Sequence, residues 1–424
     1  IALVAIEPAF MVNDDLNIQN YIDIIRDSNS PLDQEPAINY YNARKLELMG
    51  YPLNAIREYR YAANSSSAYF SSLARRRIVN IQRRTNTISL DKAAAEYEKL
   101  RYAWGDREFK IGLLEELAEI YTQNKEYYKA LETLEEAREH TTTEEKNRLT
   151  KKMVSLFEDI YYNNQDDNIP ALKSLALYQD YSWLAPMSEH YNAIVQKLAD
   201  RLVAVDLLGR AYNILETQLS AGNLTPNEAG TVGTRMALIN LFNNQPEKAV
   251  AILDKTESDR LTPTIIAHRR IIRAKALSAL GRPQEALDLL KEDYSRNGIL
   301  VKTEIFWNNR QWGDAADSIK YLIEKPQKGR PLTNEQIQLI LEWATALKKA
   351  GRETVIVRLR NTFKPYFQNT PYISIFNVLT DTLEADKIDI KNIDETINNI
   401  SAFSNFAKIY AESMQKSSLS ETIK

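Results

Sequence analysis

The sequence predicts an all-α protein that is built as a solenoid of stacked helical hairpins. Three observations support this prediction. A motif recurs in five windows: a small residue, an apolar residue three positions later, often Gly seven later, and an Ala-centred second helix twelve later. The 12 Gly and 14 Pro among 424 residues mostly separate periodic segments, as expected for helices and their connections. A single hairpin cannot bury its apolar face alone, so the hairpins must stack on their neighbours.

The recurring motif describes two antiparallel helices in close contact. Small residues let the two helices approach, larger apolar residues fill the seam, and Gly or Asn after the first helix provides its left-handed cap. The clearest copies are Ala43/Leu46/Gly50/Ala55 with Tyr59 and Ala62, Ala118/Tyr121/Ala130 with Leu134 and Ala137, and Ala274/Leu277/Gly281/Ala286 with Leu290. Looser copies are Ala199/Leu202/Ala211 with Leu215, and Ala344/Leu347/Gly351 with Ile356.

Alignment on the small residues predicts where the hairpins begin. The predicted starts are near residues 36, 74, 111, 192, 230, 267 and 337. Most adjacent starts differ by roughly 37 or 38 residues, more than the ~34 of the shortest helical-hairpin repeat, so longer helices or loops must take up the difference. Residues 1–35 are expected to be the end of a preceding repeat or an N-terminal cap.

Two further pairs are predicted in the gaps. Residues 145–191 have room for a degenerate repeat, with Phe157 and Tyr161 on the first helix and Pro170 at the start of the second. Residues 296–325 predict a shorter pair, whose turn lies at Asn308 and Asn309.

Gly and Pro suggest bends at two places, Ser220–Gly233 and Lys325–Leu332. We therefore expect an array over 36–219, its continuation over 220–325, and a last repeat with C-terminal capping helices over 326–415. The capping helices carry the apolar series Ile388, Ile390, Ile393 and Ile397. Residues 416–424 are expected to fray.

The composition restricts partners and compartment only in part. A net charge of −3 gives no global reason to expect nucleic acid or an anionic membrane as partner. The absence of cysteine excludes disulfides, thiolate zinc sites and cysteine nucleophiles, and leaves periplasm and cytoplasm at even odds. The apolar run from Ile1 to Ile6 looks cut from a longer chain, so a signal peptide or anchor upstream stays possible. No window approaches the ~18 apolar residues of a membrane span.

Nothing in the sequence indicates an enzyme, a cofactor or a metal. The three histidines, His140, His190 and His268, lie far apart and outside any metal-ligand spacing. GxSxG, GxxxxGK[ST] and GxGxxG motifs are absent. Carboxylate pairs such as Glu115/Glu116 are typical of solvated helix faces. We predict a protein without catalytic activity.

The strongest local charge is a basic helix, Arg75–Arg84, with five arginines in ten residues. Such a helix could hold phosphates or a nucleic-acid backbone. The acidic balance of the whole chain favours the alternative, an exposed face paired with neighbours such as Glu96, Glu98 and Asp106. The same interpretation applies to a second cluster, which comprises His268, Arg269, Arg270 and Arg273.

Two pairs of adjacent tyrosines, Tyr127/Tyr128 and Tyr161/Tyr162, cannot turn both rings toward one core. One ring of each pair should face outward or into the next repeat.

These patterns resemble the tetratricopeptide repeat (TPR) family. The closest match to its pattern comprises Leu117, Ala118, Tyr121, Ala130, Leu134 and Ala137, whereas the Trp and terminal Pro of the family are largely missing. Three segments look like the sequences of long TPR proteins of alphaproteobacteria: Ala93–Trp104, Leu198–Ala211 and Ile305–Ala316. This likeness implies a lineage and no particular activity. The resemblance implies a right-handed superhelix of about nine hairpins.

The resemblance also implies where a ligand would lie, because the family binds ligands along a concave face formed by the first helix of each hairpin. The candidate partner-binding residues are Tyr40, Arg44, Arg76, Arg77, Glu115, Glu119 and Lys275, with Ile271, Leu341 and Thr345 at equivalent positions. Anions at Glu115 and Glu119 disfavour a clamp for a peptide carboxylate.

We therefore predict a non-catalytic scaffold or adaptor that presents a concave groove to a protein or peptide partner. We expect it to act in a bacterial assembly or an envelope-associated complex. The next alternative is a cytoplasmic regulator or adaptor. Nucleic acid is the less favoured partner, through the Arg75–Arg84 helix. The oligomeric state stays open.

Overall fold

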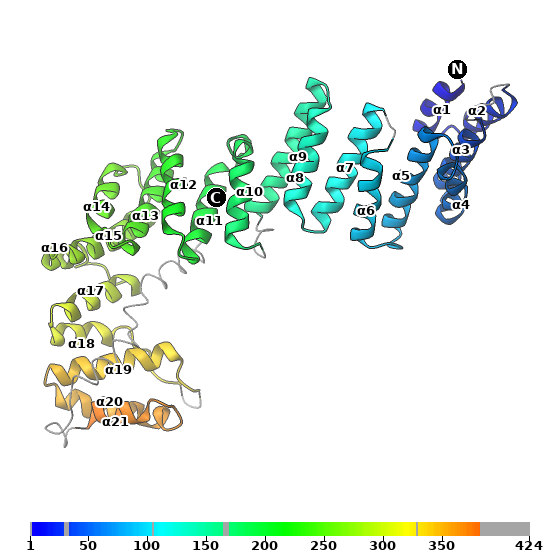
Figure 1. Ribbon diagram of the computed structural model, residues 1–424. Helices are drawn as coiled ribbons and strands as arrows, with labels where there is room; N and C mark the ends of the chain where they lie inside the picture. Colours follow the sequence, from blue (N-terminus) through cyan, green and yellow to red (C-terminus); the bar gives the residue numbers. More distant parts are fainter. Residues whose placement is uncertain (1, 29–33, 104–105, 164–168, 328–329, 382–424) are drawn as a thin grey trace. The chain divides into compact units, whose positions relative to one another are not determined.

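The computed structural model describes residues 2–28, 34–103, 106–163, 169–327 and 330–381. Every regular element in these ranges is a helix, and within each unit most helices pack on the ones next to them in the chain (Figure 1). This arrangement confirms the prediction of an all-α, TPR-like solenoid.

The chain forms two compact units. The first contains the residues up to Ile169 together with Ala176–His190, and the second contains Pro170–Leu175 and the described residues from Tyr191 onward. We describe each unit by itself.

The helices of the first unit run in chain order along the blue to green part of Figure 1. They are α1 (Ala2–Met11), α2 (Asp15–Asp27), α3 (Gln34–Leu48), α4 (Pro52–Ala63), α5 (Ala68–Arg84), α6 (Leu90–Arg101), α7 (Arg107–Gln123), α8 (Tyr127–Glu139), α9 (Thr143–Tyr161), the second half of α10 (Ala171–Asp180) and the 3-10 helix η1 (Ser182–Met187).

The second unit continues the same alternation. Its helices are the first half of α10, α11 (Tyr191–Ala204), α12 (Leu208–Ser220), α13 (Pro226–Phe242), α14 (Pro246–Lys255), α15 (Pro263–Ala279), α16 (Pro283–Leu289), α17 (Arg296–Asn308), α18 (Trp312–Lys320), α19 (Asn334–Lys349), α20 (Glu353–Phe367) and α21 (Ile373–Thr380).

Consecutive helices pair as hairpins, and we call the first helix of each pair the A helix and the second the B helix. The predicted starts near 36, 74, 111, 192, 230, 267 and 337 all fall inside A helices, namely α3, α5, α7, α11, α13, α15 and α19. The shorter pair predicted over 296–325 is α17 with α18, and the degenerate pair is α9 with α10. From α3 to α20 the described residues contain nine such pairs, as predicted.

The small residues of the motif lie where the helices touch. Ala43, Ala118, Ala199, Ala274 and Ala344 of the A helices are all 2% exposed or less. Such positions admit the neighbouring helix because a larger side chain would hold it away. The core of each unit is therefore a continuous seam between hairpins.

Eight of the turns from A to B helix share one backbone geometry. A single residue with positive φ follows the A helix: Gly50 (82°), Asn86 (52°), Lys125 (60°), Asp206 (62°), Asn244 (54°), Gly281 (74°), Arg310 (58°) and Gly351 (67°). The next N–H then bonds back across six residues, as from Tyr51 to the carbonyl of Leu46 (2.9 Å), which is a Schellman cap. The predicted Gly or Asn is present in five of these turns, whereas Lys125, Asp206 and Arg310 adopt the left-handed region without it.

The sequence predicted a bend over Ser220–Gly233, but most of that segment is helical. α13 starts at Pro226 behind a capping box of Thr225 and Glu228, so Gly230 and Gly233 lie inside a helix. A Cβ at Gly233 would collide with the side chain of Thr256, and one at Gly230 with Leu261. These glycines therefore permit close helix contact and do not interrupt the array.

The C-terminal predictions are only partly covered. Pro365 lies inside α20, and α21 packs on both α19 and α20. The predicted capping residues Ile388–Ile397 and the tail 416–424 lie outside the described residues. The boundaries predicted at 36, 220 and 326 stay predictions.

Candidate functional site

A cleft of about 570 Å³ lies in the first unit, along the A helices α5, α7 and α9. It forms because residues three or four positions apart share one helix face. The stripe on α7 comprises Gly112, Glu115, Glu116, Ala118, Glu119 and Thr122, and the stripe on α9 comprises Lys152, Ser155, Leu156 and Asp159. Arg76 from α5 and Leu134 from α8 complete the lining.

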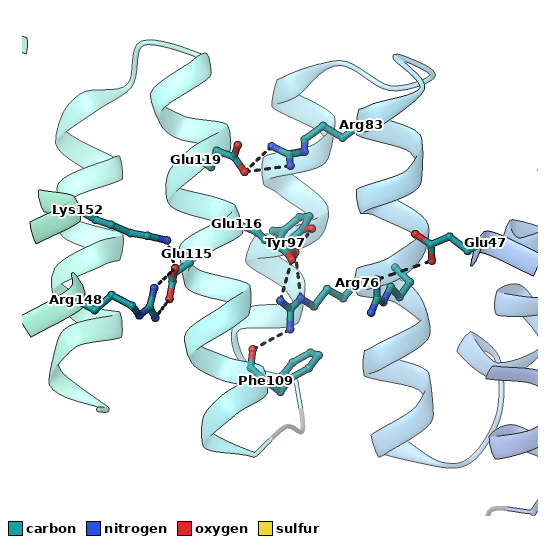
Figure 2. A network of polar contacts seen from close by, with 11 residues as sticks. Glu47, Arg76, Arg83, Tyr97, Phe109, Glu115, Glu116, Glu119, Arg148 and Lys152 are labelled. Carbon is teal, nitrogen blue, oxygen red and sulfur yellow. Dashed lines mark hydrogen bonds and ion pairs between the residues drawn. The ribbon is translucent and has the colours of Figure 1, made fainter. Parts of the chain in front are cut away.

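Arg76 and Glu116 form the best-defined pair in this cleft (Figure 2). The guanidinium donates from Nε to one carboxylate oxygen (3.1 Å) and from Nη2 to the other (2.9 Å), and Tyr97 donates to the same carboxylate (2.5 Å). Burial disfavours ionisation of Glu116, but the hydrogen bond and charge of Arg76, together with the bond from Tyr97, outweigh it and lower its pKa. Glu116 is therefore a fixed carboxylate and not a proton donor at neutral pH.

Gly112 makes room for this arginine. A Cβ at that position would lie 2.6 Å from Nη2 of Arg76. The guanidinium also lies 5.5 Å from the centre of the Phe109 ring and donates to the Phe109 carbonyl (3.4 Å). Arg76 is thus held from three sides before any ligand arrives.

Glu115 is neutralised from the opposite side. Arg148 and Lys152 of α9 both reach its carboxylate, with one Arg148 bond of 2.9 Å (Figure 2). Burial again disfavours the charged form, but these hydrogen bonds and charges lower the pKa of Glu115.

Glu119 and Asp159 are less completely paired. Arg83 donates twice to Oε2 of Glu119, at 3.2 Å each, and the Glu119 side chain stays 56% exposed. Asp159 is exposed and accepts a hydrogen bond from Asn163 (2.7 Å), and among the described residues it forms no ion pair.

The structure brings together three of the predicted partner-binding residues, Arg76, Glu115 and Glu119. Tyr40 is placed differently, because it is only 3% exposed and packs against the rings of Tyr41, Tyr59 and Phe70 at 5.2 to 5.8 Å. Such a core position leaves no surface for a partner, so that part of the prediction is corrected.

The remaining candidates lie away from the cleft. Arg44 binds Glu7 (2.7 Å) and lies over the Phe10 ring at 4.1 Å, and Arg77 lies 3.9 Å from Glu47. Lys275 belongs to the second unit, where it pairs with Glu304 at 3.2 Å. Each has a structural contact of its own, and their role in binding stays a prediction.

Nine of the twelve lining residues were not among the predicted partner-binding residues, and four of these nine lie on α9: Lys152, Ser155, Leu156 and Asp159. The first helix of a degenerate repeat has no small-residue anchor from which its face could be assigned. The sequence contained one signal for this contact: Lys152 and Glu115, which form an ion pair, are 37 residues apart, and this is the length of one repeat.

Four of the five arginines in the basic helix Arg75–Arg84 lie against carboxylates, as the favoured interpretation expected, and Arg75 donates to the Ala63 carbonyl (3.3 Å). Arg76 contacts Glu116, Arg83 contacts Glu119, and Arg77 and Arg84 both lie within 4 Å of Glu47. The expected partners were wrong, however: Glu96 pairs with Lys99, Glu98 with Arg101, and Asp106 caps α7. The arginine side chains of α5 reach carboxylates on the neighbouring A helices α3 and α7, although α5 also packs on its own B helix α6.

The second basic cluster is also paired. Arg269 is 4% exposed and donates to the carbonyls of Gly230 (3.1 Å) and Leu253, to Thr256 (3.0 Å) and to Glu257 (3.1 Å). Arg273 pairs with Asp254 at 2.6 Å. These arginines connect α14 and α15 within the second unit.

The adjacent tyrosines divide as predicted. Tyr127 is buried, whereas Tyr128 is 48% exposed and meets the Tyr181 ring edge-on at 6.1 Å. Tyr161 is buried, and Tyr162 stacks on His190 at 3.9 Å.

The described residues contain no group of three or more His, Cys, Asp and Glu side chains that could hold a metal ion. None of the helices in the described ranges is long and apolar enough to cross a membrane.

No family model matches the chain, and no curated protein matches it in sequence. Among solved structures it is similar to one described as the crystal structure of the APC/C hetero-tetramer Cut9-Hcn1, with 10% identity, a TM-score of 0.32, and coverage of 98% of this chain and 95% of that chain. The TPR-like fold accordingly stands on the packing of the described helices.

Proposed function

We propose that this chain is a diverged TPR protein that acts as a non-catalytic scaffold and binds a polypeptide segment of a partner in the cleft between α5, α7 and α9. The observation that supports the proposal most is the cleft itself, which is about 570 Å³ in volume and is lined by A-helix side chains. Its size falls within the range of sites that enclose a few side chains of a ligand.

The residues that line the cleft are better suited to binding a ligand than to catalysing a reaction. Glu116 and Glu115 each accept hydrogen bonds from basic side chains, and these bonds hold both carboxylates ionised at neutral pH. A carboxylate with a lowered pKa is a poor general acid. Side chains fixed in this way lose little conformational entropy on association, so the cleft is organised before it meets a partner.

Nucleic acid is the weaker candidate because four of the five arginines of Arg75–Arg84 lie against carboxylates. A phosphate would have to displace Glu116 from Arg76 and Glu119 from Arg83, and release of small counterions would no longer drive binding. The resemblance to long bacterial TPR proteins supports a bacterial assembly or an envelope-associated complex as the setting.

A pair of matched variants tests this function. Ser155 is exposed and lines the cleft, so Ser155→Trp fills the cleft without disturbing the core. Lys151 is exposed on the same helix but outside the lining, so Lys151→Trp is the control. Immobilised wild-type chain and both variants are incubated with an extract of the native organism, and the retained proteins are quantified by mass spectrometry.

We expect a partner that wild type and Lys151→Trp retain and that Ser155→Trp loses at least tenfold. Equal retention by all three chains would contradict a role for the cleft. Retention that nuclease treatment abolishes, and that Arg76→Ala with Arg83→Ala weakens, would replace the scaffold proposal with nucleic-acid binding. Circular dichroism melting of each variant confirms that the helices are intact.

A further inference from the structure

The first two hairpins of the chain, α1 with α2 and α3 with α4, are built in one register (Figure 1, blue helices). Asn13 (φ 56°) follows α1 as Gly50 (φ 82°) follows α3, and both turns close with the same backbone hydrogen bond across six residues, at 3.0 and 2.9 Å. Arg44 of α3 binds Glu7 of α1 (2.7 Å), and these two residues are 37 apart. Asn13 and Gly50 have the same separation, so positions 37 residues apart match one another in the two hairpins.

Both turns expose large apolar side chains at matching positions. Met11 matches Leu48, Val12 matches Met49, and Leu16 matches Leu53; all six are 41 to 83% exposed. We call these six residues the apolar edge. At the next turn of this unit, around Asn86, the same positions hold Arg84, Thr85 and Ser89, which are exposed and polar. The apolar surface therefore stops after the second hairpin.

The apolar edge is large enough to contribute most of a stable interface. A large side chain offers roughly 150 Å² of surface, so six of them at these exposures present on the order of 600 Å². The largest apolar patch of a typical monomer measures about 300–600 Å², and each partner of a stable protein interface buries about 800 Å². Ile24 on α2 and Tyr61 on α4, which are 54% and 60% exposed, also match each other and extend the surface toward that size.

The helices that follow the two turns carry opposite net charges. α2 contains three aspartates and one arginine, which give −2, and α4 contains two arginines and one glutamate, which give +1. The ion pairs within these helices are Asp23 with Arg26 (2.6 Å) and Arg57 with Glu58 (3.9 Å). The excess charge therefore belongs to Asp15 and Asp27 on α2 and to Arg60 on α4. Asp27 lies three helical turns after Leu16, and Arg60 lies two turns after Leu53, so these two charges share the outer faces of the edge leucines.

We propose that the apolar edge, together with the outer faces of α2 and α4, binds a second copy of this chain and forms a symmetric dimer. A twofold interface uses the same patch on both copies, so the patch must complement itself. Rotation about an axis that runs along α2 and α4 sets Leu16 of each copy against Leu53 of the other, and the acidic α2 against the basic α4. An axis across the helices would set α2 against α2, where like charges repel.

This inference does not depend on the proposed function, but it has a consequence for it. None of the six edge residues lines the cleft, so a dimer presents two open clefts. A partner that offers two copies of the bound segment would gain affinity from engaging both. An anionic lipid surface fits the edge less well because the acidic α2 would be repelled.

Sedimentation velocity of the full chain over a hundredfold range of concentration tests the dimer. Leu16→Glu and Leu53→Glu each place two charges in the interface, because the twofold axis repeats the change. The matched control is Leu172→Glu, the same substitution at another exposed leucine, on α10. All three positions are on the surface, so the helices should stay intact, and circular dichroism of each variant verifies this.

We expect wild type and Leu172→Glu to sediment with twice the mass of the 48.7 kDa chain, and each edge variant to weaken self-association at least tenfold. A wild-type chain that stays monomeric at every concentration would overturn the inference. If that monomer binds vesicles of phosphatidylcholine and phosphatidylglycerol, the edge is instead a lipid-binding surface. Dimers that both edge variants form as tightly as wild type would place the contact elsewhere and equally contradict the proposal.

Disulfide cross-linking then locates the twofold axis. The chain contains no cysteine, so Leu16→Cys and Leu53→Cys each introduce a single thiol. Oxidation of an equal mixture should yield at least fivefold more cross-linked dimer than oxidation of either variant alone, because the two positions face each other across the interface. A mixture of Leu172→Cys with Leu53→Cys measures the yield from random collision. Cross-linking by Leu16→Cys alone at the yield of the mixture would contradict the pairing of α2 with α4.

Discussion

The A helices of the two units carry the same kind of ion pair at nearly the same spacing, yet they use it differently. Arg83 and Glu119 in the first unit are 36 residues apart, and Arg235 and Asp200 in the second are 35 apart. The Glu119 side chain is 56% exposed at the cleft, whereas the corresponding carboxylate in the second unit, Asp200, is 21% exposed. The difference shows that an ion pair between A helices can either line a binding surface or hold adjacent hairpins in contact. Which of the two it does depends on how deeply the pair is buried.

The largest effect that separates the two uses should come from Arg269→Ala in the second unit. Removal of the guanidinium leaves two backbone carbonyls and the Thr256 hydroxyl without their donor, which should cost about 3 kcal/mol of unfolding free energy. The matched change in the first unit, Arg83→Ala, should cost about 0.5 kcal/mol because its partner is exposed. Urea unfolding, followed by hydrogen exchange of peptides from each unit, measures both. Similar losses in the two units would contradict the distinction.

Glycines on A helices provide the second test. Gly233→Ala should destabilise the second unit by about 2 kcal/mol because the new methyl group collides with buried Thr256. Gly112→Ala meets only the movable end of Arg76, so we expect a loss of less than about 1 kcal/mol. Addition of Thr256→Ala should recover part of the Gly233→Ala loss, and thermal melts of the single and double variants would reveal this. No recovery would indicate that α13 itself tolerates alanine poorly.

The turns should respond in the same way in both units, which makes them a control for the comparison. Gly281→Ala has open space around it but a φ of 74°, so we expect a loss of about 1 kcal/mol from backbone strain alone. Lys125→Gly relieves the same strain at φ 60° and should gain about 0.5 kcal/mol. Chemical denaturation of each variant gives the values. An effect of opposite sign at either turn would show that neighbouring side chains, and not φ, decide the stability.

The smallest expected effect is a difference between the two units in how their stability changes as the pH falls. The pKa of Glu115 and Glu116 is lowered in the folded state, so their stabilisation is complete above the unfolded value near about 4.3 and is lost as the pH falls through the lower folded values. Burial, with the charge of Arg235, lowers the pKa of His268, so the second unit should lose stability as the pH falls from about 6.5. Hydrogen exchange at pH 7, 5.5 and 4 should show the second unit loosening first, and His268→Gln should remove that early step.

Much of the fold could be predicted because hairpins are encoded locally. The small residue, the apolar stripe and the left-handed turn lie within about twenty residues of one another, and they located the A helices α3, α5, α7, α11, α13, α15 and α19 correctly. Gly230 and Gly233 were misinterpreted because glycine marks both helix breaks and close helix contacts, and only the position of Thr256 distinguishes the two.

The candidate site could be predicted only in part because it depends on contacts between repeats. Glu115 and Glu119 followed from their place on an A helix, but their partners Arg148 and Arg83 lie more than thirty residues away. For the arginines of the Arg75–Arg84 helix, sequence proximity suggested Glu96 and Glu98 as partners instead. Tyr40 occupies an A helix too, yet the neighbouring rings of Tyr41 and Phe70 enclose it, which no single-helix pattern reveals.

The packing of most helices on those just before and after them has a consequence for synthesis. When a hairpin leaves the ribosome, the preceding hairpin that it packs against has already emerged, so it need not wait for distant parts of the chain. The paired arginines of α5 are an exception on a small scale, since Arg76 and Arg83 stay without their carboxylates until α7 has been translated. A nascent chain halted before α7 would therefore present Arg76 and Arg83 without the carboxylates that pair with them in the finished protein.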